Sequence, residues 1–180
     1  CAGETDISNA SRPIKDSEAE TCAENGINWT EFIVALDGLS VVVSPENDFI
    51  QCLSTDDLLA LFRADSEIVT WSDLDASYPD EEIEFFVPDP DSGTRDYFVE
   101  AILEDAMGDE ADVRQDGNTT NSSDDNQLLQ GIGGNEFAIG FFGFAYYVNN
   151  QDSVQIVEIE NADGDCIAPS DTTVQDGTYN

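Results

Sequence analysis

Histidine is absent from this chain of 180 residues, and lysine occurs once, at Lys15. Histidine is the most common general base in enzymes and a frequent zinc ligand, so a Ser-His-Asp triad is excluded. The four cysteines show no Cys-x-x-Cys spacing, which argues against a zinc site. Carboxylates are so numerous that no single pair indicates a glycosidase, and Asp163-Gly164-Asp165 is only a fragment of a calcium loop. We therefore expect no catalytic residues, no metal site and no cofactor.

Basic residues are scarce, because five lysines and arginines face 40 aspartates and glutamates, for a net charge of −35. The acidic residues are spread over the whole length of the chain. Phosphate backbones and anionic membranes attract lysine and arginine, so this balance argues against nucleic acid and anionic membrane surfaces as partners. An even acidic excess is typical of proteins from salt-rich environments, where charges are screened beyond about 3 Å near molar salt. We predict that the fold needs high salt.

Long apolar runs are also missing. No stretch approaches the ~20 apolar residues of a membrane-spanning helix, and no signal peptide is recognisable, so we expect no direct membrane insertion of these residues. The apolar content of 40% nevertheless argues against general disorder. At this length the chain can bury one core or two small lobes.

The cysteines present are Cys1, Cys22, Cys52 and Cys166. An even number of cysteines without metal-binding spacing suits two disulfides in an extracytoplasmic protein. Of the three possible connectivities we favour Cys1–Cys22 with Cys52–Cys166. Four buried free thiols are the alternative.

Apolar strands alternate with helical segments along the chain, which is typical of an α/β fold. Strands are expected at 32–36, 39–43, 84–87, 137–142 and 153–159. Helices are expected from residue 11 to about 25, over 58–62 after a cap at Ser54, from about 95 to 107, over 126–130 and around 146–147. Trp71 and Tyr78 are expected in a polar loop, 108–126 as a mobile loop, and 163–180 without a clear element. The first two strands are so uniformly apolar that both faces of their sheet should be covered.

The most informative segment is the turn Asp91-Ser92-Gly93-Thr94-Arg95, which joins the apolar run 83–87 to an amphipathic helix. A tight turn of this kind exposes unpaired backbone N–H groups at the positive end of a helix dipole, which makes a natural anion site. Simple helix capping is the alternative. Ser11 and Arg12 lie at a second expected helix start, where Pro13 suits the first turn.

Several further segments are informative because of their order along the chain. They are Cys1 to Ile14, Ala35 to Leu39 with the Val-rich strand and Ser44 to Asn47 after it, Cys52 to Ser54, Trp71 to Asp73, Asp91 to Phe98, and Ala138 to Tyr147. Together they cover nearly the whole chain. In these segments the sequence resembles the substrate-binding protein of the high-affinity phosphate ABC importer.

This resemblance implies a two-lobed periplasmic-binding-protein fold of the α/β class. Residues 1–38 would belong to the first lobe, 39–147 would form the second lobe, and 148–180 would return to the first lobe. The resemblance also implies that the chain is truncated at both ends, so that the second lobe is largely complete and the first is partial.

The ligand residues implied by the resemblance come from both lobes. The second lobe would bind phosphate through Ser92, Gly93 and Thr94. The first lobe would contribute Ser11, with Arg12 beside it. Two further residues are expected near the ligand: Asp91 would accept a proton from hydrogen phosphate, and Arg95 would either reach the anion or pair with nearby acidic residues.

The implied function is extracytoplasmic binding of inorganic phosphate and its delivery to the membrane permease of an ABC importer, without turnover. The protein would act in the periplasm or at the cell surface, exported or anchored through a segment that is not present here. One alternative is a secreted phosphatase-like enzyme on the same scaffold, which would need a nucleophile or a metal. The other is a receptor for a different oxyanion, such as sulfate, molybdate or tungstate.

Overall fold

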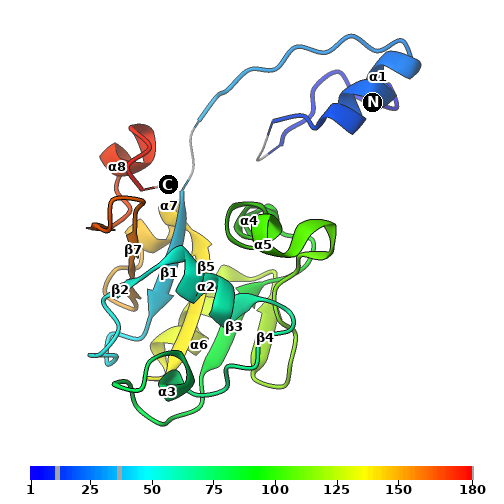
Figure 1. The fold of residues 1–180 in the computed structure, drawn as a ribbon. Helices are drawn as coiled ribbons and strands as arrows, with labels where there is room; N and C mark the ends of the chain where they lie inside the picture. Colours follow the sequence, from blue (N-terminus) through cyan, green and yellow to red (C-terminus); the bar gives the residue numbers. More distant parts are fainter. Residues whose placement is uncertain (11–12, 36–37, 180) are drawn as a thin grey trace. The chain divides into compact units, whose positions relative to one another are not determined.

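The computed structural model describes residues 1–10, 13–35 and 38–179. The chain divides into two compact units, Cys1–Leu36 and Asp37–Asn180 (Figure 1). The second unit contains the described part of 148–180, and its strand β6 (Gln155–Ile156) pairs with β1 (Leu39–Val43). The assignment of 1–38, 39–147 and 148–180 to the lobes of a larger fold stays a prediction.

The first unit contains helix α1 (Asp16–Glu24), which a disulfide between Cys1 and Cys22 joins to the start of the chain. The helix begins after Lys15, whose backbone N–H donates to the Glu18 carboxylate at 2.9 Å. It ends before Gly26, whose φ of +68° is a conformation that favours glycine. Residues 13–15 are not helical, so the helix expected from residue 11 to about 25 is present only from Asp16 onward. Ser11 and Arg12 themselves lie outside the described residues.

The expected strand 32–36 is also wrong in its described part. Phe32, Ile33 and Val34 belong to no strand and are 78–93% exposed. A strand requires a neighbouring strand to complete its hydrogen bonds, and an apolar β-branched sequence cannot by itself supply one.

The second unit is built on a five-stranded sheet with the order β4-β3-β5-β1-β6. Besides β1 and β6, its strands are β3 (Glu84–Pro88), β4 (Thr119–Ser122) and β5 (Ala138–Gly143). Strand β3 runs parallel to both β4 and β5, whereas β1 runs antiparallel to β5 and β6. A smaller sheet has the order β2-β7-β8, formed by Cys52–Leu53, Glu158–Glu160 and Cys166–Ile167. The disulfide Cys52–Cys166 links the two outer strands of this smaller sheet, so both favoured disulfides are confirmed.

Apolar side chains cover both faces of the five-stranded sheet, as the uniform apolar character of 39–43 predicts. On β1, Val41 and Val43 belong to one buried cluster with Phe62 and Phe85. Val42, one residue from each, belongs to a second buried cluster on the other face. This arrangement places the sheet between two layers of helices, which is the α/β architecture expected from the sequence.

Helices of the second unit pack against both clusters. Their bounds are α2 (Thr55–Phe62), α3 (Trp71–Leu74), α4 (Gly93–Phe98), a π-helical turn (Val99–Leu103), α5 (Glu104–Met107), a 3₁₀ turn (Gly108–Glu110), α6 (Asp125–Gly133), α7 (Phe144–Val148) and α8 (Asp171–Gln175). Phe98 and Leu103 pack into the first cluster, and Leu128 and Ile132 of α6 into the second. Residues 93–107 form one helical run, which confirms the helix expected from about residue 95.

Local interactions fix the start of α2 and the packing of β5. The capping signal at Ser54 is confirmed, because its hydroxyl accepts the Asp57 N–H at 3.1 Å at the start of α2. Gly140 in β5 lies where the sheet is most crowded. A Cβ atom there would stand 2.1 Å from the Phe86 carbonyl oxygen, so no larger residue fits without a shift of the backbone.

Four sequence expectations for this unit are wrong. Trp71 does not lie in a polar loop but begins α3, fully buried, with its indole N–H donating to the Phe137 carbonyl at 3.0 Å. The segment 108–126 is not one loop, because its polar residues Thr119–Ser122 form β4 alongside β3. The expected strand 153–159 divides into β6 and β7 in two different sheets. Residues 163–180 contain β8 and α8. These elements depend on partners distant in sequence, which local composition does not reveal.

Candidate functional site

The turn that follows β3 lies at a switch point of the sheet. The connection from β3 to β4 passes through the helical run 93–107 on one face, and the connection from β4 to β5 passes through α6 on the other. The parallel strands β3, β4 and β5 therefore end at one edge of the sheet, where the chain changes direction. Ligands of α/β proteins bind at such edges.

Asp89 builds the first half of this turn. Its backbone N–H donates to the Ser122 carbonyl of β4 at 3.1 Å, which fixes the turn to the neighbouring strand. Its carboxylate accepts the Asp91 N–H at 3.2 Å, and its carbonyl accepts the Ser92 N–H at 3.1 Å. Sequence reasoning missed Asp89, although an aspartate two residues before a turn N–H is a known turn signal.

Ser92 begins the helix and confirms that the turn includes a helix cap. Its hydroxyl accepts the Thr94 N–H at 3.2 Å, and its carbonyl accepts the Asp96 N–H at 3.0 Å. Among the residues that the structure describes, the backbone N–H groups of Gly93 and Arg95 have no hydrogen-bond partner. Ser92, Gly93 and Thr94 are partly exposed, so the free N–H of Gly93 and the two hydroxyls can meet a ligand. The turn is thus both a cap and a set of free donors.

Asp91 precedes these donors in the sequence and Arg95 follows them, and the two side chains differ in their exposure to solvent. Asp91 is exposed. Arg95 is 2% exposed, and its guanidinium bonds Asp112 at 2.7 Å, which is the pairing alternative that the sequence left open. A direct contact of Arg95 with an anion would require it to give up existing bonds.

The predicted residues therefore fall into two groups. Asp91, Ser92, Gly93, Thr94 and Arg95 lie together in one turn. Ser11 and Arg12 lie outside the described residues, and their part in a site stays a prediction.

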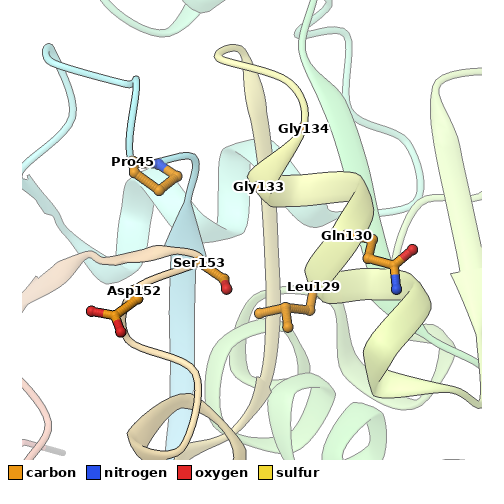
Figure 2. A pocket seen from close by; sticks show the side chains of 7 residues that line it. All are labelled: Pro45, Leu129, Gln130, Gly133, Gly134, Asp152 and Ser153. Carbon is orange, nitrogen blue, oxygen red and sulfur yellow. The ribbon is translucent and has the colours of Figure 1, made fainter.

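The second unit also has an open depression of about 420 Å³, shown in Figure 2. Its lining residues are Pro45, Leu129, Gln130, Gly133, Gly134, Asp152 and Ser153. Pro45 follows β1, which runs antiparallel to β5, so this depression lies at the opposite edge of the sheet from the turn after β3. Asp152 is the one charged side chain among these lining residues, and no basic side chain lies among them.

Two further findings concern the described ranges, 1–10, 13–35 and 38–179. No group of three or more histidine, cysteine, aspartate or glutamate side chains there could hold a metal ion. No helix in the same ranges is both long enough and apolar enough to span a membrane.

Comparison with known protein families identifies the superfamily to which this fold belongs. The family model described as "PBP superfamily domain" matches residues 1–180. The chain belongs to the PBP superfamily. Membership confirms the periplasmic-binding-protein fold that the resemblance implied.

This PBP superfamily chain is similar to curated relatives and to solved structures. It is 41% identical to "Protein SphX" of Synechococcus elongatus and 36% identical to "Phosphate-binding protein PstS" of Staphylococcus haemolyticus, each over 99% of this chain. It spans about half the length of these curated relatives, 51% and 53%. A possible phosphate binding protein from Planctomyces limnophilus has a TM-score of 0.78 at 39% identity, over 94% of this chain and 58% of that one.

Phosphate is bound in a further solved structure with a similar fold. The structure of a putative phosphate ABC transporter substrate-binding protein from Clostridium perfringens, with bound phosphate, has a TM-score of 0.66 at 25% identity. The similarity covers 94% of this PBP superfamily chain and 60% of the other.

Proposed function

We propose that the protein containing this chain binds inorganic phosphate outside the cytoplasm and delivers it to the membrane permease of an ABC importer. The role is capture and release, without turnover. The names of the PstS relatives and the phosphate-bound structure from Clostridium perfringens support this proposal. Two disulfides suit an exported protein, because they persist in oxidising compartments.

The observation that carries the proposal is the set of donors in the turn after β3. The unpaired N–H of Gly93 and the hydroxyls of Ser92 and Thr94, all on partly exposed residues, can donate to the oxygens of a tetrahedral anion. Backbone dipoles and hydroxyls can hold a buried oxyanion without a matching positive charge. This explains how a chain of net charge −35 can bind an anion, since local donors dominate when salt screens the distant charges.

Asp91 supplies a basis for choosing between oxyanions. Its exposed carboxylate, next to the donors, can only accept hydrogen bonds when ionised. Hydrogen phosphate carries a proton that it can donate to such an acceptor, whereas sulfate has none and is repelled. We therefore expect phosphate to bind more tightly than sulfate, molybdate or tungstate.

Titration calorimetry of the full-length protein with inorganic phosphate tests this function. Ser92→Ala and Thr94→Ala should each weaken binding by roughly 1–3 kcal/mol, the contribution of a charge-assisted hydrogen bond. Ser77→Ala is the control, because Ser77 is exposed and lies in the connection before β3, away from the turn. Unchanged phosphate affinity in both turn variants would rule out the site. Release of phosphate from a chromogenic ester would instead indicate the phosphatase-like enzyme.

A further inference from the structure

The second unit buries two arginines, Arg95 and Arg114, at 2% and 4% exposure. A buried guanidinium is costly unless its N–H groups and its charge are satisfied, so its partners show what it holds in place. The two arginines hold different parts of the unit.

Every N–H of the Arg95 guanidinium has a partner. Nε donates to Asp112 Oδ1 at 3.3 Å. Nη2 donates to the same oxygen at 2.7 Å and to the Val113 carbonyl at 3.1 Å. Nη1 donates to the Pro88 carbonyl at 3.2 Å and to Asn121 Oδ1 at 2.9 Å. A guanidinium has five N–H donors, and these five bonds use all of them. The side chain therefore acts on its protein surroundings and has no donor left for a ligand.

These bonds hold both ends of the turn after β3. Pro88 is the last residue of β3, directly before the turn, and Arg95 itself stands directly after Thr94. Asn121 lies on the neighbouring strand β4. The guanidinium thus ties the entry of the turn, its exit and the adjacent strand to one rigid, planar group.

Asp112 completes the arrangement. Its carboxylate also accepts the Val113 N–H at 2.7 Å and the Gln115 side-chain amide at 3.1 Å. The negative charge of Asp112 lies against the positive charge of Arg95, so the pair adds little net charge behind the turn. Arg95 then contributes geometry to the turn more than electrostatic attraction for an anion.

We propose that Arg95 is a positioning residue, which fixes the free donors of the turn where a tetrahedral oxyanion needs them. The proposal rests on the function proposed above. The role of Arg95 follows because affinity depends strongly on where the donors lie. Donors that must first be ordered when the ligand binds contribute less to the binding free energy.

Arg114 offers a matched control within the same unit. Its guanidinium lies 4.2 Å from the centre of the Phe85 ring, pairs with Asp116, and donates to the Leu61 and Ile68 carbonyls at 3.0 Å each. It is as buried as Arg95 but makes no bond to the turn. Loss of Arg114 should therefore lower stability without moving the donors.

The test compares Arg95→Met with Arg114→Met in the full-length protein, at one salt concentration. Two quantities are measured: the Kd for inorganic phosphate by calorimetry, and hydrogen–deuterium exchange of the amides of residues 89–95 without ligand. Arg95→Met should raise the Kd about tenfold or more and speed exchange in the turn. Arg114→Met should change the Kd less than threefold, despite a lower Tm. A folded Arg95→Met protein with wild-type Kd and exchange would overturn the proposal, as would equal losses of affinity in the two variants.

A milder variant covers the case in which Arg95→Met does not fold. Asn121→Ala removes one bond to the guanidinium and leaves Arg95 in place, so it should speed exchange in the turn and raise the Kd to a smaller extent. No change in either quantity would overturn the proposal. If the wild-type protein binds no phosphate, the proposed function fails, but exchange in the ligand-free variants still decides whether Arg95 orders the turn.

Discussion

The two units of the chain are stabilised by different means. In the first unit, Cys22 is the only buried side chain among the described residues, and a disulfide fastens it to Cys1. The second unit buries apolar side chains on both faces of a sheet, in two clusters. A covalent link and local hydrogen bonds thus replace a core in one unit, whereas the other has a core that a second disulfide only supplements.

The two units also differ in charge. Residues 1–36 carry seven acidic and two basic residues, a net charge of −5, and residues 37–180 carry 33 acidic and three basic residues, a net charge of −30. Each of the three basic residues of the second unit, Arg63, Arg95 and Arg114, is paired with an aspartate. Self-repulsion should therefore weigh most on the unit that depends on a core.

Salt should produce the largest difference between the units. We expect the second unit to melt well below its high-salt Tm in 0.1 M salt and to be stabilised strongly at 3 M, because screening shortens the reach of its charges. A Trp29→Phe variant leaves Trp71, buried in this unit, as the fluorescent reporter. Equal melting temperatures at the two salt concentrations would contradict the prediction.

The second largest difference should appear when one aromatic ring is removed from each unit and the losses of stability are compared. Phe62 is fully buried and packs edge-on against Phe85, Phe98 and Phe141, so Phe62→Ala should cost about 3–5 kcal/mol. Phe32, which is 78% exposed, supplies the matched change, and Phe32→Ala should alter stability by about 0.5 kcal/mol or less. Chemical denaturation followed through Trp71 measures the first effect. Similar costs for the two variants would remove the distinction between the units.

Loss of a disulfide should affect the first unit more completely. Cys22→Ser opens a link between residues 21 apart, worth about 3 kcal/mol, and the described residues of this unit form no buried apolar cluster to replace it. We expect α1 to unfold, seen as rapid amide exchange over residues 16–24. Cys166→Ser in the second unit should lower stability but leave the five-stranded sheet protected. Persistence of α1 in Cys22→Ser would show that local hydrogen bonds suffice.

The smallest expected effect concerns acid. Burial alone would raise the pKa of Asp116, but hydrogen bonds from Arg114 and Thr119 outweigh it and lower this pKa below 3.8. A lowered pKa means that the group stabilises the fold above about pH 4, and that this contribution is lost as pH falls through the pKa of the folded state. Asp116 is 45% exposed, so the contribution is about 0.5 kcal/mol. In Asp116→Asn, the free energy of unfolding should fall by about 0.5 kcal/mol less between pH 4 and lower pH than in the wild type. Denaturation measured over this pH range tests the prediction, and the same pH dependence in both proteins would contradict it.

Sequence patterns predicted the elements that are determined locally. The Val-rich run 39–43 and the cap at Ser54 each carry their own signal and lie where expected. Strand β4 was missed because its residues are polar and only its position beside β3 makes it a strand. The expected strand 32–36 is not formed in its described part, 32–35, because hydrophobicity says nothing about whether a pairing partner exists.

The candidate site divides in the same way. The turn of Ser92, Gly93 and Thr94 was recognisable because hydroxyl and glycine residues at a helix start have a local meaning. The partners of Arg95 could not be predicted, since Asp112 and Asn121 are 17 and 26 residues away along the chain. Ser11 and Arg12 remain predictions.

The pairing of every arginine in the second unit has a practical consequence for proteolysis. Trypsin cleaves after lysine and arginine, and residues 37–180 contain no lysine. Arg95 and Arg114 are buried, which leaves Arg63, with a side chain 37% exposed, as the one accessible basic residue of this unit. Cleavage at the other two arginines requires the unit to open, so the appearance of those peptides over time measures how often the folded core unfolds.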